Sequence, residues 1–259
     1  TFYYAYFRSE KFIESDLKPH VYGIRDGRSI DVEGMKSINI PYTIFDEQRR
    51  IGEFINSINH LITLHQRKLE KLKIIKKSML ENLFPQNGEK TPKIRFSGFT
   101  KDWEQRKLGE VADIIGGGTP STLNLDYWDG NIDWYSPAEI IDQIYVYRSQ
   151  RKITELGFEK SSAKMLPEGT VLFTSRAGIG KTAILAKRGC TNQGFQSIVP
   201  YSNKLDSYFI FSRTEELKKY GELVGAGSTF VEVSGRQMGN MQLMIPKTIG
   251  EQHIIGLLF

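Results

Sequence analysis

The longest regular pattern of apolar residues in the chain lies between Phe45 and Phe84. No glycine lies between Gly52 and Phe84, and the first proline after Phe45 is Pro85. Apolar side chains recur at steps of three and four residues, interrupted only at His65, and they are Ile51, Ile55, Ile58, Ile62, Leu69, Leu72, Ile75, Met79 and Leu83. This spacing predicts one helix over residues 45–84, and a period of about 3.5 residues is typical of a coiled coil.

The predicted helix is too long to be buried inside a compact domain, because at about 1.5 Å per residue it would reach roughly 60 Å. Its apolar seam is narrow. The other faces carry many basic residues, namely Arg49, Arg50, Arg67, Lys68, Lys71, Lys73, Lys76 and Lys77. A narrow seam between charged faces fits a single partner, so we expect one antiparallel helix to pack against it.

The residues after the helix change in character twice. Residues 85–100 contain proline, glycine and charged residues and are predicted to form a linker. From Lys101 to Thr248, short β-branched and aromatic runs alternate with turn signals; these runs are VADII, NIDWYS, GTVLFTS, TAILA and QSIVP. Helices are expected near residues 137–141 and 207–220. The predicted fold class is therefore α+β, a mixed domain of residues 101–248 joined to a long coiled-coil helix.

The sequence around the start of the long helix is repeated near the end of the chain. The matching positions are Ser29 and Ser234, Gly34 and Gly239, Ile40-Pro41 and Ile245-Pro246, and, after a one-residue gap, Glu47-Gln48 and Glu251-Gln252. Each copy is predicted to run from the last strand of a domain, through a proline turn, into a helix. The repeat predicts the order domain, helix, domain, helix. Residues 1–44 would then end a first domain, and residues 249–259 would begin a second helix.

Composition and charge narrow the kinds of partner. The formal net charge of +5 favours a polyanionic partner. The one cysteine, Cys190, excludes an internal disulfide and a cysteine-based zinc cluster, and no two of the four histidines have ligand spacing beside an acidic residue. No apolar run approaches the roughly 18 residues of a membrane-spanning helix. We expect neither a metal site nor a membrane partner for this chain.

Two motifs suggest catalysis at first sight, and neither has the required pattern. The stretch SRAGIGKT, residues 175–182, has Ser175 where a phosphate-binding loop needs glycine. Asp206, Glu216 and Lys218 have a nuclease-like spacing, but TEELKKY has the pattern of a helix face rather than a strand. The Asn/Asp-Pro-Pro-aromatic motif of an amino-methylating enzyme is also missing from the sequence. Catalysis by this chain is therefore not expected.

Polar and basic loop residues suit contact with DNA instead. The stretch IIGGGTPST, residues 114–122, lacks the GxGxxG pattern of a dinucleotide site. It is either a loop with unusual backbone angles or a loop that brings Thr119 and Ser121 to phosphates or bases. An Arg, Asn or Gln side chain can make two hydrogen bonds to the edge of one base, whereas Lys, Ser and Thr mostly contact phosphates. Trp134 and Phe195 are expected in the core rather than as stacking platforms.

Six stretches of the chain, in this order, resemble the specificity subunits of type I restriction-modification systems. They are KIRFSGFTKDWEQRKLGEVADIIGGGTPST, YWDGNIDWYSPAEI, LPEGTVLFTSRAGIGKTAI, NQGFQSIVP, GAGSTF and IPKTIGEQHII. With the long helix they cover almost the whole chain. The resemblance implies a non-catalytic DNA reader with two target-recognition domains separated by two long antiparallel helices. Each domain would bind one half of a bipartite site in double-stranded DNA.

The resemblance also implies partners and cofactors. Two methyltransferase (M) subunits, which bind S-adenosylmethionine and modify adenine, would dock on the helices, and ATP- and magnesium-dependent restriction (R) subunits would join them. No cofactor is expected in this chain itself, and the complex would act in a prokaryotic cytoplasm. The alternative hypothesis is a protein-interaction scaffold, built on the coiled coil, with only non-specific affinity for DNA.

Carried onto this sequence, the resemblance assigns residues 101–248 to a recognition domain and residues 45–84 to the central helix. Four loops are expected to contact DNA, at residues 116–122, 134–136, 176–181 and 227–236. The candidate contacts in and near these loops are Thr119, Ser121, Tyr135, Ser136, Arg176, Lys181, Gln193, Ser228, Thr229 and Arg236. Arg176 and Gln193 are the expected base readers.

Overall fold

The computed structural model describes residues 2–22, 29–86, 88–176, 178–226 and 232–258. The chain divides into two compact units, Thr1–Lys77 and Ser78–Phe259. The boundary between them falls within the long helix α3 (Phe45–Asn82). None of the described helices is long and apolar enough to cross a membrane.

Helix α3 confirms the predicted long helix, although it ends two residues early. It has 38 residues, and at about 1.5 Å per residue it is about 57 Å long. Its apolar seam faces solvent, with the side chains of Ile62, Leu69 and Leu72 each about half exposed. Every other helix in the described ranges has 12 residues or fewer. The antiparallel partner helix therefore stays a prediction.

Helix α3 ends at Asn82 because the next two side chains enter the core of the second unit. Leu83 and Phe84 are both buried. The ring of Phe84 packs edge-on against Trp103, with ring centres 6.1 Å apart, and the guanidinium of Arg213 lies 4.0 Å from the centre of the same ring. Burial of apolar surface at this point outweighs continuation of the helix.

The first unit contains short elements before α3. They are α1 (Phe2–Tyr6), the π-helical turn η1 (Lys11–Leu17), the 3-10 turn η2 (Lys18–His20), β1 (Val21–Tyr22), β2 (Ser29–Ile30) and α2 (Val32–Lys36). Strands β1 and β2 pair antiparallel. Phe12 is buried against the rings of Tyr6 and Phe7. Residues 38–44, which lead into α3, have no regular secondary structure.

The strand predicted before Pro41 is therefore not formed, whereas its counterpart in the second copy of the repeat is. That counterpart is β12 (Gln242–Ile245), which pairs antiparallel with β3 (Glu104–Lys107). A lone strand leaves its backbone N–H and C=O groups unpaired, so it needs such a neighbour. In the described ranges, no strand pairs with residues 38–44. The prediction of a strand in both copies is wrong for the first copy for this reason.

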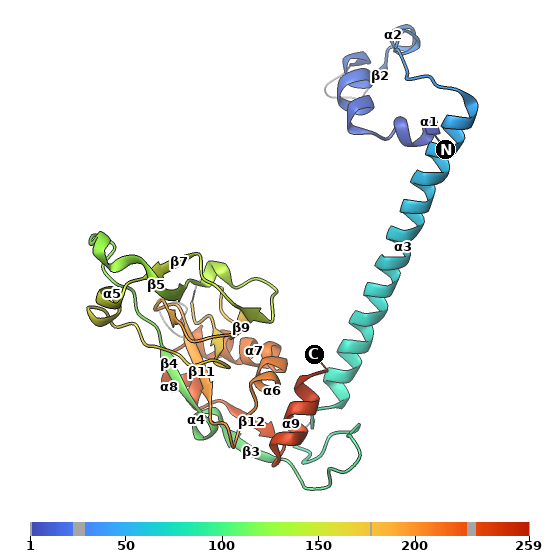
Figure 1. The fold of residues 1–259 in the computed structure, drawn as a ribbon. Helices are drawn as coiled ribbons and strands as arrows, with labels where there is room; N and C mark the ends of the chain where they lie inside the picture. The colour runs from blue at the N-terminus through green and yellow to red at the C-terminus, as the bar shows by residue number, and fades with distance from the viewer. Residues whose placement is uncertain (1, 23–28, 87, 177, 227–231, 259) are drawn as a thin grey trace. The chain divides into compact units, whose positions relative to one another are not determined.

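The second unit is a mixed α+β domain, as predicted (Figure 1). Its main sheet has the strand order β4-β11-β8-β9-β6, with β4 (Ala112–Gly116), β11 (Gln196–Pro200), β8 (Val171–Phe173), β9 (Thr182–Leu185) and β6 (Tyr145–Val146). A smaller sheet has the order β10-β5-β7, with β10 (Cys190–Thr191), β5 (Trp128–Tyr135) and β7 (Arg151–Ile153). The β6–β9 and β5–β10 pairs are parallel, and the other pairs of these sheets are antiparallel.

Short helices connect the strands of this unit. They are α4 (Leu108–Val111), α5 (Glu155–Glu159), α6 (Ser207–Ser212), α7 (Thr214–Gly225), α8 (Gly235–Gly239) and α9 (Ile249–Gly256), with 3-10 turns η3 (Leu125–Tyr127) and η4 (Pro137–Glu139). Helices α6 and α7 pack against the main sheet, and α5 packs against the smaller sheet. The predicted helix over residues 207–220 is two helices, because Arg213 has a non-helical backbone and interrupts it. The helix predicted near residues 137–141 is only the turn η4.

Among the described residues of this unit, the buried apolar side chains form three clusters. Behind the main sheet, Phe173 and Ile198 pack with Phe209 of α6 and Leu217 of α7. The smaller sheet is packed around Trp128 and Trp134, whose rings meet edge to face 5.2 Å apart, together with Ile153 and the free Cys190. A third cluster, which contains Tyr135 of β5, Leu172 of β8 and Ala183 of β9, joins the smaller sheet to the main sheet.

A buried carboxylate joins the start of α9 to the linker that follows α3. The side chain of Glu251 is 2 % exposed and accepts hydrogen bonds from Arg95 Nε (2.8 Å), Arg95 Nη2 (2.9 Å) and Trp103 Nε1 (3.1 Å). A buried charge is stable only when it is paired and hydrogen-bonded, and both conditions hold here. Glu251 therefore fixes the linker, the strand β3 that follows Trp103, and α9 to one another.

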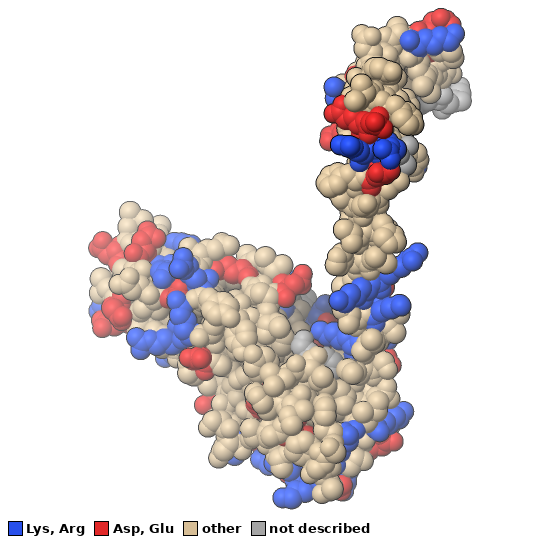
Figure 2. Space-filling view, turned by 45° about the vertical axis from the view of Figure 1, so that its right-hand side comes forward, with Lys and Arg blue, Asp and Glu red and all other residues tan. Residues whose placement is uncertain are grey.

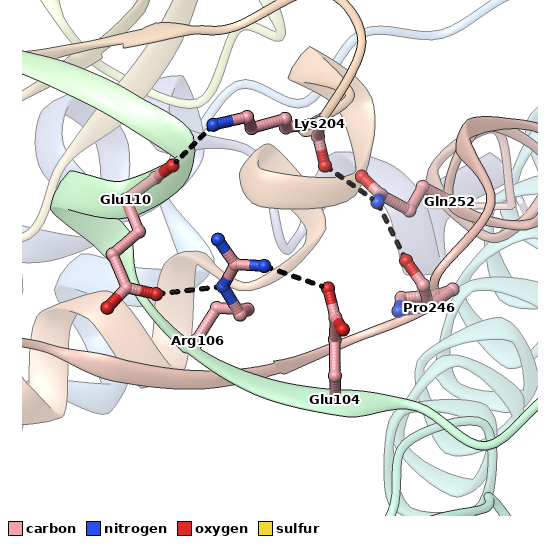
Figure 3. Close-up of polar contacts among 6 residues, drawn as sticks. All are labelled: Glu104, Arg106, Glu110, Lys204, Pro246 and Gln252. Carbon is pink, nitrogen blue, oxygen red and sulfur yellow. Dashed lines mark hydrogen bonds and ion pairs between the residues drawn. The ribbon is translucent and has the colours of Figure 1, made fainter.

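Gln252, the next residue of α9, completes this junction. Its Nε2 donates to the carbonyl oxygens of Pro246 (2.9 Å) and Lys204 (3.0 Å), and its Oε1 accepts from the backbone N–H of Asp206 (2.9 Å). Figure 3 shows the two donated bonds, beside the more exposed pairs that Arg106 makes with its neighbours on β3 and α4. The Glu-Gln pair thus satisfies backbone groups and a charge that burial would otherwise leave unpaired.

We predict that Arg95→Met lowers the free energy of unfolding of the second unit by about 3 kcal/mol, because it leaves the Glu251 carboxylate buried without its cation. The three tryptophans, Trp103, Trp128 and Trp134, all lie in this unit, so their fluorescence in urea measures its unfolding. Arg106→Met is the matched control, since the Arg106–Glu110 pair is solvent-exposed and should contribute far less. Equal effects of the two substitutions would contradict this account of the junction.

We predict that Cys190 does not react with a thiol reagent in the folded protein. Its side chain is completely buried, and this burial raises the pKa of the thiol to about 12, so the reactive thiolate is scarce at neutral pH. Absorbance of the Ellman chromophore checks this, with one thiol expected after full denaturation. Rapid stoichiometric labelling without denaturant would show that the core around β10 is open.

Candidate nucleic-acid interface

The turn between β10 and β11, residues 191–195, is the point where the candidate loops meet. The carbonyl oxygen of Thr191 accepts a hydrogen bond from Gly118 N (2.9 Å) in the glycine-rich loop. Asn192 N donates to the carbonyl of Tyr135 (3.0 Å) at the end of β5. The carbonyl of Gly194 accepts from Ser175 N (2.8 Å) at the end of β8. Backbone hydrogen bonds therefore hold three predicted loops on one turn.

The glycine-rich loop is shaped by close packing and not by unusual backbone angles. Among the described residues, the glycines with positive φ are elsewhere, and Gly116, Gly117 and Gly118 are not among them. A Cβ on Gly117 would overlap the carbonyl oxygens of Thr191 and Asn192, and a Cβ on Gly118 would overlap the backbone of residues 162 and 163. The interpretation of this stretch as a loop with unusual angles is therefore wrong, because the backbone approaches its neighbours too closely for a side chain.

Two tryptophans of the smaller sheet fix the path of the same loop. Trp134 Nε1 donates to the carbonyl of Gly118 (2.8 Å), and Trp128 Nε1 donates to the carbonyl of Ser121 (3.1 Å). Both indole rings are buried, so Trp134 is a core residue as predicted, and so is the fully buried Phe195. Buried indole N–H groups need acceptors, and here the loop carbonyls provide them. The backbone of the loop is thereby fixed, while the side chains of Ser121 and Thr122 are exposed.

Thr119 and Gln193 come together at the tip of this arrangement. The hydroxyl of Thr119 donates to Oε1 of Gln193, whose side chain is exposed. The Gln193 amide N–H groups and the exposed Ser121 remain on the surface close to this pair. A glutamine amide has donors and an acceptor in one plane, which suits a base edge.

The β8–β9 hairpin, residues 174–181, carries Arg176 and Lys181. Thr174 Oγ1 accepts from Lys181 N (2.9 Å) and donates to the carbonyl of Gly178 (2.7 Å), which closes the hairpin. Strand β9 follows the hairpin, whereas a phosphate-binding loop leads into a helix, so this is not a nucleotide site. Arg176 is half-buried and its Nε lies near Gly194; Lys181 is exposed.

The stretch that enters α8 is anchored to the same hairpin. Val233 N donates to the carbonyl of Ser175 (3.0 Å), and Ser234 begins α8 with a capping box in which its hydroxyl and backbone N–H both donate to Gln237 Oε1. Arg236, in the first turn of α8, is exposed. The predicted contacts Ser228 and Thr229 lie outside the described residues.

Two of the predicted DNA contacts do not fit their positions. Tyr135 has no exposed surface, and burial raises the pKa of its hydroxyl, so its side chain is a core group and not a contact. Ser136 is half-buried, and both its N–H (2.8 Å) and its hydroxyl (3.0 Å) donate to Glu139 Oε1. Both faces of β5 are buried over residues 132–135, so Tyr135 is enclosed, and the turn that follows engages the hydroxyl of Ser136.

The three residues with nuclease-like spacing, Asp206, Glu216 and Lys218, each have a separate structural contact. Asp206 accepts from Phe209 N (2.9 Å) and so caps α6, while Glu216 of α7 pairs with Arg213. The side chain of Lys218 packs against Gly180. Within the described parts of the chain, no group of three or more His, Cys, Asp or Glu residues has the arrangement of a metal site.

The basic residues of the smaller sheet are partly neutralised. Asp133 is buried and forms ion pairs with Lys152 (3.5 Å) and Lys187 (3.2 Å). Arg151 stacks on Trp128, with its guanidinium 3.6 Å from the ring centre. Figure 2 shows acidic side chains interspersed with basic ones on the visible face. Sequence analysis did not predict these pairings, because partners that are distant in sequence are brought together only by the fold.

The comparisons with known proteins agree with one another. Residues 100–257 match the family model "Type I restriction modification DNA specificity domain". The chain is 35% identical over 161 residues to the type I restriction enzyme MjaIX specificity subunit of Methanocaldococcus jannaschii, covering 61% of this chain and 37% of that protein. It is 26% identical over 163 residues to the EcoR124I/EcoR124II specificity subunit of Escherichia coli, covering 60% and 40%. The chain thus spans about two fifths of these relatives.

Solved structures show the same fold. The HsdS subunit from Thermoanaerobacter tengcongensis superposes with a TM-score of 0.57 at 19% identity, covering 96% of this chain and 58% of that one. The S subunit from M. genitalium gives a TM-score of 0.62 at 13% identity, covering 93% and 60%. At these identities the likeness establishes the fold alone.

We predict that Gly117→Ala and Gly118→Ala each lower the free energy of unfolding by about 1–3 kcal/mol, because the new methyl group meets backbone that cannot move aside. Gly116→Ala is the control, since its Cβ would make an ordinary contact 3.6 Å from Gln196 Oε1. Urea unfolding followed by tryptophan fluorescence measures all three variants. A loop that tolerated alanine at both 117 and 118 would show that close packing does not determine its sequence.

Proposed function

The chain belongs to the type I restriction-modification DNA specificity family, and from this premise we propose that residues 101–248 bind one half of a bipartite site in double-stranded DNA. The protein would then be the sequence reader of a complex and not its catalyst. The observation that carries the proposal is the convergence of the glycine-rich loop, the end of β5 and the β8–β9 hairpin on the turn at residues 191–195, with the start of α8 held on the same hairpin.

The proposed contact surface combines a fixed backbone with polar side chains that are exposed or, at Thr119 and Arg176, half-buried. Its members are Thr119, Ser121, Arg176, Lys181, Gln193 and Arg236. Arg176 and Gln193 are the proposed base readers, because a guanidinium and an amide each make paired hydrogen bonds with a base edge. The hydroxyl, lysine and remaining arginine groups would contact phosphates and set the register on the duplex.

Helix α3 is proposed to hold the recognition domain within a larger assembly. Its exposed apolar seam would receive the second long helix of the family plan, and methyltransferase (M) subunits would dock on the helices. S-adenosylmethionine would be bound by those M subunits, and ATP and magnesium by restriction (R) subunits. The complex would act in the cytoplasm of a prokaryote, where it would meet chromosomal DNA.

A scaffold function remains the second candidate, since the seam of α3 is the largest run of exposed apolar residues in the described first unit. In that case α3 would bind proteins, and the domain would have only weak, sequence-independent affinity for DNA. The basic residues toward the C-terminal half of α3 fit either function, because they remain on its outer faces.

Mapping methylated adenines separates the two functions. DNA would be sequenced for modification from cells that make the intact protein with its cognate methylating subunit, and from cells that lack this chain. A bipartite motif that depends on the chain supports the reader, and exchanging residues 101–248 for those of a relative should change one half of the motif only. Copurification of the two proteins without chain-dependent methylation would establish the scaffold instead.

We predict that Arg176→Ala weakens binding to a duplex carrying the mapped motif by about 10- to 100-fold and relaxes discrimination at one position. Arg236→Ala should weaken binding to all sequences and reduce the slope of log affinity against log salt by about one. Fluorescence anisotropy over a salt series measures both effects. Lys247→Ala is the control, because Lys247 is exposed at the turn between β12 and α9 and belongs to none of these loops. Equal losses at positions 176 and 247 would contradict the proposed surface.

A further inference from the structure

A further segment of the chain, residues 161–166, runs beside β10 toward the turn at residues 191–195. Leu166 and Gly189 form an antiparallel bridge, in which Leu166 N donates to the carbonyl of Gly189 (2.9 Å) and Gly189 N donates to the carbonyl of Leu166 (3.1 Å). Because the two stretches run in opposite directions, the residues before Leu166 lie alongside those after Gly189. The segment therefore approaches the turn on which the candidate loops meet.

The same segment contacts the glycine-rich loop at Gly118. A Cβ on Gly118 would overlap the hydroxyl of Ser162 and the backbone of Ser162 and Ala163. Gly118 N in turn donates to the carbonyl of Thr191 (2.9 Å). The segment and the glycine-rich loop are thus in direct contact beside the turn. None of the four loops predicted from the sequence includes these residues.

Buried neighbours keep two polar side chains of this segment at the surface. Ala163 and Leu166 are buried, and Ala163 N donates to Ser161 Oγ (3.2 Å), which fixes the backbone at the start of the segment. Ser162 and Lys164, which lie on either side of Ala163, are exposed. Their backbone is held by the core and by the bridge to β10, while their side chains remain accessible to a ligand.

The charge of Lys164 is not neutralised by the protein. Lys152 and Lys187 both form ion pairs with the buried Asp133, and Arg151 stacks on the ring of Trp128. No carboxylate in the described ranges lies within ion-pair distance of Lys164. An exposed ammonium on a fixed backbone, without an anionic partner, suits a fixed negative group on a ligand.

We propose that residues 162–164 are a further DNA-contacting element, in which Lys164 and the hydroxyl of Ser162 bind phosphates of the duplex backbone. This inference rests on the proposed DNA binding and adds a segment to its surface. A lysine ammonium and a serine hydroxyl on phosphates position a protein on the duplex and carry no sequence information. The element therefore adds affinity for every sequence and fixes the register of Gln193, the base reader proposed on the adjacent turn.

A salt series with Lys164→Met, which removes the charge and keeps an unbranched side chain, tests this element. We expect affinity for every duplex, with or without the mapped motif, to fall by about three- to tenfold at about 0.1 M salt, and the slope of log affinity against log salt to decrease by about 0.9. The ratio of affinities for motif and non-motif duplexes should not change, whereas Arg176→Ala should lower it. Fluorescence anisotropy with the full chain measures these quantities.

Lys204→Met is the matched control for the charge. Lys204 is exposed and follows the end of β11, whereas the turn at residues 191–195 precedes the start of that strand. Its slope against salt should equal that of the wild-type chain. Urea unfolding should be unchanged in Lys164→Met, because the side chain is exposed and has no partner among the described residues.

A cross-linking experiment measures the contact directly. Cys190, the one native cysteine, is completely buried, so Lys164→Cys adds a single accessible thiol. Duplexes that carry the mapped motif and a short disulfide tether on one phosphate at a time are incubated with this variant. We expect a covalent link at one or two phosphates beside the half-site, and none with Lys204→Cys.

The possible results separate this inference from the proposed function. Salt-dependent binding that is the same in Lys164→Met and the wild-type chain, or a changed base preference in Lys164→Met, would overturn the inference and leave the proposed function standing. Weaker binding accompanied by a matching loss of stability in urea would also overturn it, since Lys164 would then support the fold. Failure of the wild-type chain to bind any duplex would overturn both.

Discussion

The buried ion pair between Glu251 and Arg95 is the interaction on which the rest of the second unit depends. It connects residues 156 positions apart, and it lies where the linker, β3 and α9 meet. Burial of Glu251 would be costly without Arg95 and Trp103, so the interactions of these three side chains depend on one another. Phe84 packs on Trp103 and so attaches the last turn of α3 to the same centre.

Around the turn at residues 191–195, the groups that fix the backbone path differ from the groups that form the exposed surface. The backbone path is determined by buried groups, namely the indoles of Trp128 and Trp134 and the close approach of Gly117 and Gly118 to their neighbours. The exposed side chains, such as those of Gln193 and Arg236, contribute little to that path. A surface built in this way is rigid before a partner binds, so little conformational entropy is lost on binding.

Patterns that repeat along the chain were predictable, and effects of distant contacts were not. The seam from Ile51 to Met79 predicted α3, because apolar periodicity survives without tertiary context. Its end at Asn82 depends on the burial of Leu83 and Phe84 in the core of the second unit. The spacing of apolar residues carries no information about that burial. Strand-like runs predicted the strands, but the burial of Tyr135 follows from its packing in an apolar cluster with residues of β8 and β9. The break at Arg213 and the missing strand before Pro41 likewise depend on neighbours far away in sequence.

The close approach of Gly117 and Gly118 has a consequence for how such a domain changes over generations. Substitution of either glycine disturbs the fold itself, while Thr119, Ser121 and Gln193 stand on a backbone that others hold in place. Substitutions at these three positions are therefore expected to leave the fold intact. The surface of such a domain can vary over generations while its architecture is inherited unchanged.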